Sequence, residues 1–147
     1  MESRLSSLLQ DKGYTIHLIS PDVTVYECAK KMNLLGIGAL LVMEDDKLIG
    51  IVSERDIIRK VISCNCEVGK FKVADIMTTE LVTVTPSTSV AEAMQLVTEK
   101  RFRHLPVIEN GKLIGIISIG DLTRWAMLAQ KNEISSLTKY IHGDHHQ

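Results

Sequence analysis

The sequence predicts an α/β (α+β) fold of two β-α-β-β-α repeats, packed face to face with pseudo-twofold symmetry. The main observation is a duplication: Lys47 to Ile57 (KLIGIVSERDI) reappears as Lys112 to Leu122 (KLIGIISIGDL) with no gap. About a third of the aligned positions between Ile19 and Lys60 are identical to their partners, against roughly one in fifteen by chance. In both copies an isoleucine-rich run, typical of a buried strand, leads into a Ser-x-x-Asp pair, typical of a helix start. Neither repeat is large enough to bury its own sheet, so the two should pack against each other.

Composition places the chain among ordinary globular proteins. The 147 residues are 45% hydrophobic, enough for one domain or for two small repeats that share a core. Only 4% are aromatic and the net charge is -1, so we expect no nucleic-acid partner. No apolar run approaches the roughly 20 residues of a membrane span. The first residues lack the plan of a signal peptide and the three cysteines are an odd number, so we expect reduced thiols and a cytoplasmic protein.

The first repeat is expected to follow a short amphipathic helix, Ser3 to Lys12, which Gly13 ends. The alternation from Tyr14 to Ile19 predicts a strand. Thr24 and Glu27 predict a capping box, followed by a helix that Gly36 and Gly38 break. The buried face of that helix should consist of Val25, Cys28, Ala29 and Met32. The next expected elements are a strand over 39–43, a turn over 44–46, a strand over 47–52 and a helix from 54 to about 62.

The second repeat follows a polar connector, Cys64 to Lys72, and a leading segment, Val73 to Thr78. A strand over Leu81 to Val84 should match Tyr14 to Ile19. Asn110-Gly111 is a strong hairpin signal between the last two strands. The remaining expected elements are a Ser89/Glu92 capping box, a helix with Val90, Ala93, Met94 and Val97 buried, a strand over 105–108, and a last helix to about Leu137. The predicted divisions are an N-terminal helix at 1–13, a first repeat at 14–66, a linker at 67–75, a second repeat at 76–137 and a flexible tail at 138–147.

From about Gly13 to Leu137 the chain resembles a tandem pair of CBS domains, the regulatory module named after cystathionine β-synthase, in its stand-alone form. The motifs that carry the resemblance are the two KLIG stretches, Asp75 to Thr78 (DIMT), and Glu99 to Val107 (EKRFRHLPV). The resemblance implies an adenosine ligand: AMP first, with ADP, ATP, NAD(H) or S-adenosylmethionine as alternatives. It also implies a disc-shaped homodimer of two such pairs.

The two Ser-x-x-Asp pairs are the candidate ribose sites. A helix N-terminus beside a strand end can hold an anion through its free N–H groups. The resemblance implies that Asp121 and Asp56 each accept hydrogen bonds from both ribose hydroxyls, and that Ser118 and Ser53 lie near ribose or phosphate. A carboxylate suits a cis-diol because it offers two acceptor oxygens. The alternative is that each pair only caps its helix, which stabilises it by about 1 kcal/mol.

Arg101, Arg103 and His104 place three cations or potential cations just before a strand. The resemblance puts them at the phosphate end of the second cleft between the repeats, and the alternative is a solvated face. The first repeat has no cation at these positions, where Gly36, Gly38 and Ala39 stand. Arg55 can compensate, because a cation in the first turn of a helix is disfavoured by the helix dipole and indicates a nearby anion.

The leading segment of the second repeat resembles the part of the family motif that lines the adenine pocket. Its candidate residues are Ile76, Met77, Thr78 and Val82, and their first-repeat counterparts are Thr15 and His17. Packing in the core is the alternative for the apolar ones.

Other features are assigned ordinary roles. Cys64-x-Cys66 is expected to be part of a plain connector; the alternatives are a redox pair, or a metal site that would need His142, His145 or His146 from the tail. Trp125, aligned with Lys60, is expected to pack. We find no phosphate-binding glycine loop, no nucleophile–base motif and no suitably spaced acid pair, so we expect no enzyme, no catalytic cofactor and no metal.

We therefore expect a regulatory sensor that binds an adenosine nucleotide in the clefts between the repeats and transmits binding to a regulated protein, which the sequence does not identify. The alternative is a homodimeric scaffold with no small ligand, for which the cations would be superfluous. A weaker alternative is a sensor of divalent metals, for which Asp45 and Asp46 look too much like a turn. Which ligand binds, how many clefts fill and how the dimer is arranged are open at this stage.

Overall fold

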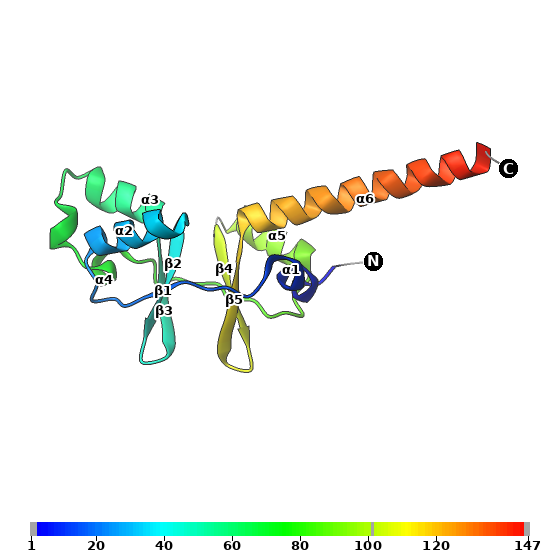
Figure 1. Cartoon of the computed structure of the whole chain (residues 1–147). Helices are drawn as coiled ribbons and strands as arrows, with labels where there is room; N and C mark the ends of the chain where they lie inside the picture. Colours follow the sequence, from blue (N-terminus) through cyan, green and yellow to red (C-terminus); the bar gives the residue numbers. More distant parts are fainter. Residues whose placement is uncertain (1–2, 101, 146–147) are drawn as a thin grey trace. The chain divides into compact units, whose positions relative to one another are not determined.

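The computed structural model describes residues 3–100 and 102–145, with side chains as far as Asn132 (Figure 1). It divides into two compact units. Thr15–Val82 forms one, which we call the first-repeat unit; Met1–Tyr14 together with Thr83–Gln147 forms the other, the second-repeat unit.

The first-repeat unit holds a three-stranded sheet in the order β1-β2-β3. β1 pairs in parallel with β2, and β2 pairs antiparallel with β3. The strands are β1 (Leu18–Ile19), β2 (Ala39–Glu44) and β3 (Lys47–Ser53). The helices are α2 (Val25–Leu35), α3 (Glu54–Ile57), the π-helix η1 (Ile58–Ile62), the 3-10 helix η2 (Val68–Lys70) and α4 (Val73–Ile76).

The second-repeat unit repeats this plan around a two-stranded antiparallel sheet. Its strands are β4 (His104–Glu109) and β5 (Lys112–Ser118), and its helices are α1 (Leu5–Lys12), α5 (Val90–Glu99) and α6 (Ile119–His145). Figure 1 shows α6 leaving the end of β5 as one long helix. None of the helices in the described part of the chain has the length and apolar character needed to cross a membrane.

The strand registers confirm the duplication. Ala39 pairs with Ser53 in the first hairpin, as His104 pairs with Ser118 in the second. Both hairpins shift register at matching places, Val42/Met43 and Val107/Ile108. The repeat is therefore a structural one down to its β-bulge.

Each unit has its own apolar core. α1, although it precedes the first repeat in the chain, contributes three leucines to the second-repeat core: Leu5, Leu8 and Leu9 are at most 2% exposed. Among the residues whose side chains the structure describes, other buried apolar ones in that unit include Val84, Val90, Ala93, Val97, Leu105, Val107, Ile117 and Leu122. The first-repeat core consists of Ile19, Val25, Cys28, Met32, Leu40, Val42, Val52, Ile57, Val61, Val73 and Ile76.

The segments that lead into the repeats are anchored alike. The N–H groups of Val73 and Ala74 donate to the carbonyls of Val23 and Pro21, at the start of the first repeat. In the other unit Leu5 and Ser6 donate in the same way to Thr88 and Pro86. α4, which precedes the second repeat in the chain, thus docks on the first-repeat unit. α1, which precedes the first repeat, docks on the second-repeat unit.

Most caps and turns agree with the predictions. Thr24 and Ser89 accept hydrogen bonds from the N–H groups of Glu27 and Glu92, which confirms the N-cap half of each predicted capping box but not the reciprocal bond from the glutamate side chain. Gly36 ends α2 in the left-handed region with a φ of 66°, which glycine adopts at little cost. The Asn110-Gly111 turn has two positive φ angles, 52° and 77°, as a two-residue hairpin turn of this kind requires.

Several predicted elements need correction. The strand expected over Tyr14 to Ile19 is only Leu18–Ile19, and that over Leu81 to Val84 is reduced to one parallel bridge from Val84 to Val107. Both lie at a sheet edge, where only one neighbour supplies hydrogen bonds. The helix expected from 54 to 62 changes to a π-helix at Ile58. α6 runs to His145, past the expected end at Leu137.

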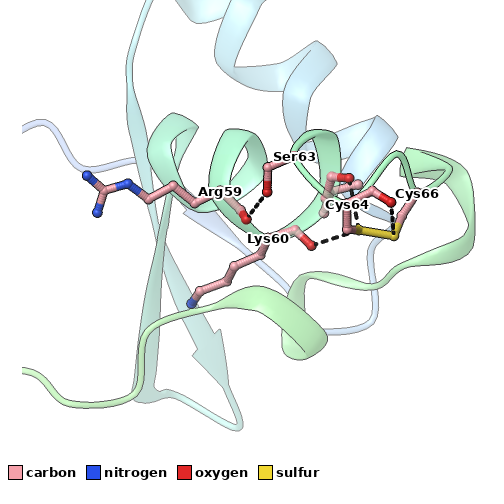
Figure 2. The surroundings of a disulfide bond; sticks show 6 residues. Arg59, Lys60, Ser63, Cys64 and Cys66 are labelled. Carbon is pink, nitrogen blue, oxygen red and sulfur yellow. Dashed lines mark hydrogen bonds between the residues drawn. A yellow bond between two sulfur atoms is a disulfide. The ribbon is translucent and has the colours of Figure 1, made fainter.

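The cysteines also differ from the expectation. Cys64 and Cys66 form a disulfide at the end of η1, whereas we expected reduced thiols (Figure 2). Their Cα atoms are 5.3 Å apart, within the ordinary range for a bridge. Cys28 is free and buried, and burial raises the pKa of its thiol to about 11 despite the nearby Lys31 charge.

Candidate functional site

Both Ser-x-x-Asp pairs form reciprocal capping boxes where a strand of the central hairpin ends. The Ser53 N–H donates to Asp56 Oδ2 at 2.9 Å, and the Asp56 N–H donates to Ser53 Oγ at 3.3 Å. The matching distances for Ser118 and Asp121 are 2.8 and 3.1 Å. The boxes hold each carboxylate at the first turn of a helix, with the side chain of Asp56 13% exposed and that of Asp121 11% exposed. Each is therefore oriented and partly desolvated.

In the first-repeat unit Asp56 is the centre of a small polar network, the Asp56 cluster (Ser53, Asp56, Lys60 and Thr78). Asp56 Oδ1 accepts a hydrogen bond from Thr78 Oγ1 at 3.3 Å and lies 3.2 Å from Lys60 Nζ. Lys60 Nζ also donates to the Ile76 carbonyl at 2.8 Å. Asp56 Oδ1 thus has both a hydroxyl donor and an ammonium group beside it.

Thr78 reaches this cluster because it pairs with the edge of β3. Its N–H and carbonyl exchange both backbone hydrogen bonds with Ile51, at 2.8 and 3.0 Å. Gly50 permits the close approach, since a Cβ there would lie 3.0 Å from the Thr78 carbonyl oxygen and 2.9 Å from Met77 Sδ. The sequence placed Ile76 to Val82 with the second repeat, but the structure brings Thr78 to the first-repeat carboxylate.

In the second-repeat unit Asp121 is surrounded by cations, forming the Asp121 cluster (Lys12, Ser118, Asp121 and Arg124). Lys12 Nζ donates to Asp121 Oδ2 and to the Ile116 carbonyl. Arg124 Nη1 lies 3.5 Å from Asp121 Oδ1. Burial raises the pKa of Asp121, but the hydrogen bond and charge of Lys12, with hydrogen bonds from Ser118, outweigh it and lower the pKa overall. The carboxylate is thus held ionised.

Two of the predicted phosphate ligands, at the start of β4, lie beside the start of α6. The Ile119 N–H donates to the Arg103 carbonyl at 2.9 Å, and His104 pairs with Ser118 across the hairpin. At the matching place in the first repeat the Glu54 N–H donates to Gly38, where a Cβ would lie 3.0 Å from Glu54 Oε1. The structure therefore places the backbone of Arg103 and His104 beside the Ser118–Asp121 pair, and at Gly38 a side chain would require only the carboxylate end of Glu54 to move.

The other predicted site residues are more scattered. Arg55 is exposed in the first turn of α3. Ile76 is 2% exposed and part of the first-repeat core, which favours the packing alternative for its side chain. Met77, Val82 and His17 are half-buried, and Thr15 is exposed. Arg101 lies outside the described residues.

Sequence reasoning missed three cations of the two clusters. Lys60 stands four residues after Asp56 and Arg124 three residues after Asp121, spacings that place side chains together on a helix, so both had a local signal. Lys12 had none, because only the docking of α1 brings it to Asp121.

Two hollows adjoin the candidate residues. One of about 460 Å³ lies by the end of α2 and the start of α3, and its lining includes Met32, Gly36, Gly38, Glu54 and Ile58. The other, of about 160 Å³, lies between α1 and α6, and its lining includes Lys12, Asp121, Arg124 and Trp125. Across the residues that the structure describes, no three His, Cys, Asp or Glu side chains gather as they would around a metal ion.

Comparisons with known proteins agree in pointing to one family. The family model of the CBS domain matches residues 15–63 and 73–128. The chain is 44% identical to the "CBS domain-containing protein CBSX3, mitochondrial" of Arabidopsis thaliana, over 95% of this chain and 72% of that protein. It is 32% identical to YhcV, a CBS domain-containing protein of Bacillus subtilis, over 97% of this chain and all of that protein.

Solved structures give the same result. A putative signal-transduction protein with CBS domains from Burkholderia ambifaria superposes with a TM-score of 0.82 at 44% identity, over 87% of this chain and 96% of that one. The CBS-domain protein ATU1752 from Agrobacterium tumefaciens gives a TM-score of 0.80 at 34% identity, over 84% and 99%.

Proposed function

Because the chain belongs to the CBS domain family, as an α+β CBS pair, we propose that it is a regulatory module that binds an adenosine nucleotide. CBS domain proteins are generally regulatory or signal-transduction modules, and stand-alone pairs are typically not catalytic. The ligand we propose first is AMP, with ATP, NAD(H) and S-adenosylmethionine as alternatives.

The observation that carries the proposal is the pair of oriented carboxylates at matching helix starts. Asp56 and Asp121 are each fixed by a capping box, and Asp56 already accepts a hydroxyl donor. In this proposal they are the two candidate positions for ribose hydroxyls, of which a bound nucleotide uses one, while the backbone at Met77 and Thr78 contacts adenine. Phosphate is held by Arg103, His104, Arg55 and the two serines, with Arg101 as a further predicted ligand.

We further propose that the pair forms a homodimer and passes ligand binding to a regulated protein. A ligand that binds one arrangement of the chain better than another shifts the population towards it, and so alters the surface that a partner meets. A cytoplasmic location stays a prediction; the Arabidopsis relative is named as mitochondrial.

The test is a thermal melt with and without excess AMP, after bound nucleotide has been stripped. Ligand at about 100 times Kd adds about 2.7 kcal/mol to the free energy of unfolding, a shift of several degrees for a domain of this size. The double variant Asp56→Asn/Asp121→Asn should lose the shift. Asp75→Asn is the matched control, since Asp75 also caps a helix, through the Lys72 N–H at 2.8 Å, but lies outside both clusters.

The second candidate is a scaffold without a small ligand. It is favoured by exposed apolar side chains on α2 and η1, among them Tyr26, Leu34, Ile58 and Ile62, which are 49% to 85% exposed. If AMP, ATP, NAD and S-adenosylmethionine all leave the melting temperature unchanged, the nucleotide proposal is wrong and the scaffold becomes the better explanation.

A further inference from the structure

The two ribose candidates differ because their leading segments follow different paths after the same start. α4 ends at Ile76, and the chain then extends so that Thr78 pairs with Ile51 on the edge of β3. α1 starts in the equivalent way but remains helical to Lys12 before Gly13 ends it with a φ of 101°. Leu9 of α1 takes the place of Met77. Met77 Sδ lies 2.9 Å from the Cβ position of Gly50, and Leu9 Cδ2 lies 3.0 Å from the Cβ position of Gly115, the matching glycine.

The edge of β5 is consequently covered by a side chain. Ile116 is the counterpart of Ile51, and its carbonyl accepts a hydrogen bond from Lys12 Nζ. The same ammonium donates to the Asp121 carboxylate. In the second repeat, Lys12 thus contacts both the edge of β5 and the Asp121 carboxylate. In the first repeat, Thr78 pairs with the edge of β3, and the Asp56 carboxylate is contacted by both Thr78 and Lys60.

The contacts of the two carboxylates differ in strength. Asp121 has a cation at each oxygen, Lys12 at Oδ2 and Arg124 at Oδ1, but the Arg124 side chain is 70% exposed and 3.5 Å away, so Lys12 is the stronger of the two. The side chain of Lys12 is only 25% exposed. Asp56 Oδ1 has a neutral hydroxyl at 3.3 Å and the ammonium of Lys60 at 3.2 Å, and the Lys60 side chain is 45% exposed.

We propose that Lys12 decides which repeat takes the nucleotide: the ribose binds at the Asp56 cluster, and Lys12 keeps the Asp121 cluster closed. The proposal rests on the proposed function and assigns it to one of the two sites.

Displacement explains the preference. A ribose offers two neutral hydroxyls, and at Asp121 they would have to replace a charge-assisted hydrogen bond in a partly desolvated place, which is the stronger kind. Lys12 is also tethered, because α1 is anchored by the buried Leu8 and Leu9. Lys60 also donates to a backbone carbonyl, that of Ile76, at 2.8 Å, but its side chain is 45% exposed and it stands on the same helical segment as Asp56. It can therefore turn into solvent without moving the backbone and exchange this hydrogen bond for one to water, which leaves Asp56 Oδ1 available to a hydroxyl.

Isothermal titration calorimetry with AMP on stripped protein tests this assignment. The wild type should bind one AMP per chain, Asp56→Asn should lose that binding, and Asp121→Asn should keep it. Lys12→Met should raise the number bound to two per chain. If Lys12 leaves Asp121 free in about a tenth or less of wild-type molecules, the variant should bind AMP at the Asp121 cluster with a Kd at least about tenfold lower than the wild type does. Lys70→Met is the matched control, because Lys70 pairs with exposed Glu67 in the connector, at 3.5 Å, away from both clusters, and the variant should still bind one AMP per chain.

The outcomes separate the two proposals. Binding that is lost in Asp121→Asn and kept in Asp56→Asn overturns the role of Lys12 while the nucleotide function stands. If Lys12→Met still binds one AMP per chain, or binds AMP more weakly than the wild type, the role of Lys12 is also overturned and the nucleotide function stands. Absence of AMP binding in every variant contradicts the proposed function and this inference with it. If Lys12→Met does not fold, Lys12→Gln replaces it, and the two aspartate variants still decide which carboxylate is used.

Discussion

Gly50 and Gly115 occupy matching positions on β3 and β5, yet the atoms they face differ. A Cβ at Gly50 would meet the Thr78 carbonyl oxygen, a backbone atom, at 3.0 Å. A Cβ at Gly115 would meet only Leu9 Cδ2, the end of a flexible side chain, at 3.0 Å. At the scale of single residues, the first repeat therefore needs its glycine to hold the segment that reaches Asp56.

We predict that Gly50→Ala lowers the free energy of unfolding by about 1–3 kcal/mol, since overpacking against backbone forces a shift. Gly115→Ala should cost less than about 1 kcal/mol, because Leu9 can rotate away and alanine suits a strand better than glycine. Urea melts of both variants give the comparison. Equal losses would show that Leu9 is as rigid as the Thr78 backbone.

At the scale of elements, the helix after β3 ends in an unusual way. α3 has four residues and passes into the five-residue π-helix η1, and the Cys64–Cys66 disulfide closes the following turn. Asn65, between the two cysteines, has a φ of 58°, a region that asparagine tolerates better than most residues. Cys64 Sγ lies 3.2 Å from the Val61 carbonyl oxygen. This sulfur has no proton to donate while the disulfide is intact, so the bridge rather than a hydrogen bond holds the turn.

We predict that a dithiol reductant lowers the free energy of unfolding by about 1.6 kcal/mol, the loop-entropy value for a three-residue loop. The variant Cys64→Ser/Cys66→Ser should not respond to the reductant. Intact mass after alkylation at pH 8 supplies the second measurement. The native protein should gain no adduct before reduction, because Cys28 is buried and its pKa is raised to about 11, and two adducts afterwards. Two adducts without reductant would contradict the disulfide.

At the scale of the molecule, one of the two units is built from segments that are far apart in the sequence. α1 precedes the first repeat but packs in the second-repeat unit, where its three leucines are almost wholly buried. Each buried leucine typically contributes about 2–5 kcal/mol, so α1 carries a share comparable to a domain's entire stability.

We predict that deletion of residues 1–13 unfolds the second-repeat unit and spares the first. Hydrogen exchange followed by mass spectrometry should show lost protection in peptides from 83–132 and retained protection in peptides from 15–82. The variant Leu34→Ala is the control, because Leu34 is 85% exposed and should change neither set. Lost protection in 15–82 alone would contradict the assignment of α1.

The features that a reader of the sequence can predict are those set by neighbours in the chain. The duplication, the paired hairpins and the Ser-x-x-Asp caps are confirmed, because each cap joins atoms only three residues apart and each hairpin is specified by its turn and its apolar pattern. The ribose role of Asp56 and Asp121 came from the family resemblance and stays a prediction until nucleotide binding is measured.

The remaining features depend on contacts between distant parts of the chain, and only the folded chain decides them. The lengths of the edge strands depend on how far a partner strand runs alongside. Thr78 meets Asp56, and Lys12 meets Asp121, because α4 and α1 each dock on the unit of the other repeat. The same motif, written twice in the sequence, thus acquires two different surroundings, and the difference lies in a lysine that no local pattern connects to its carboxylate.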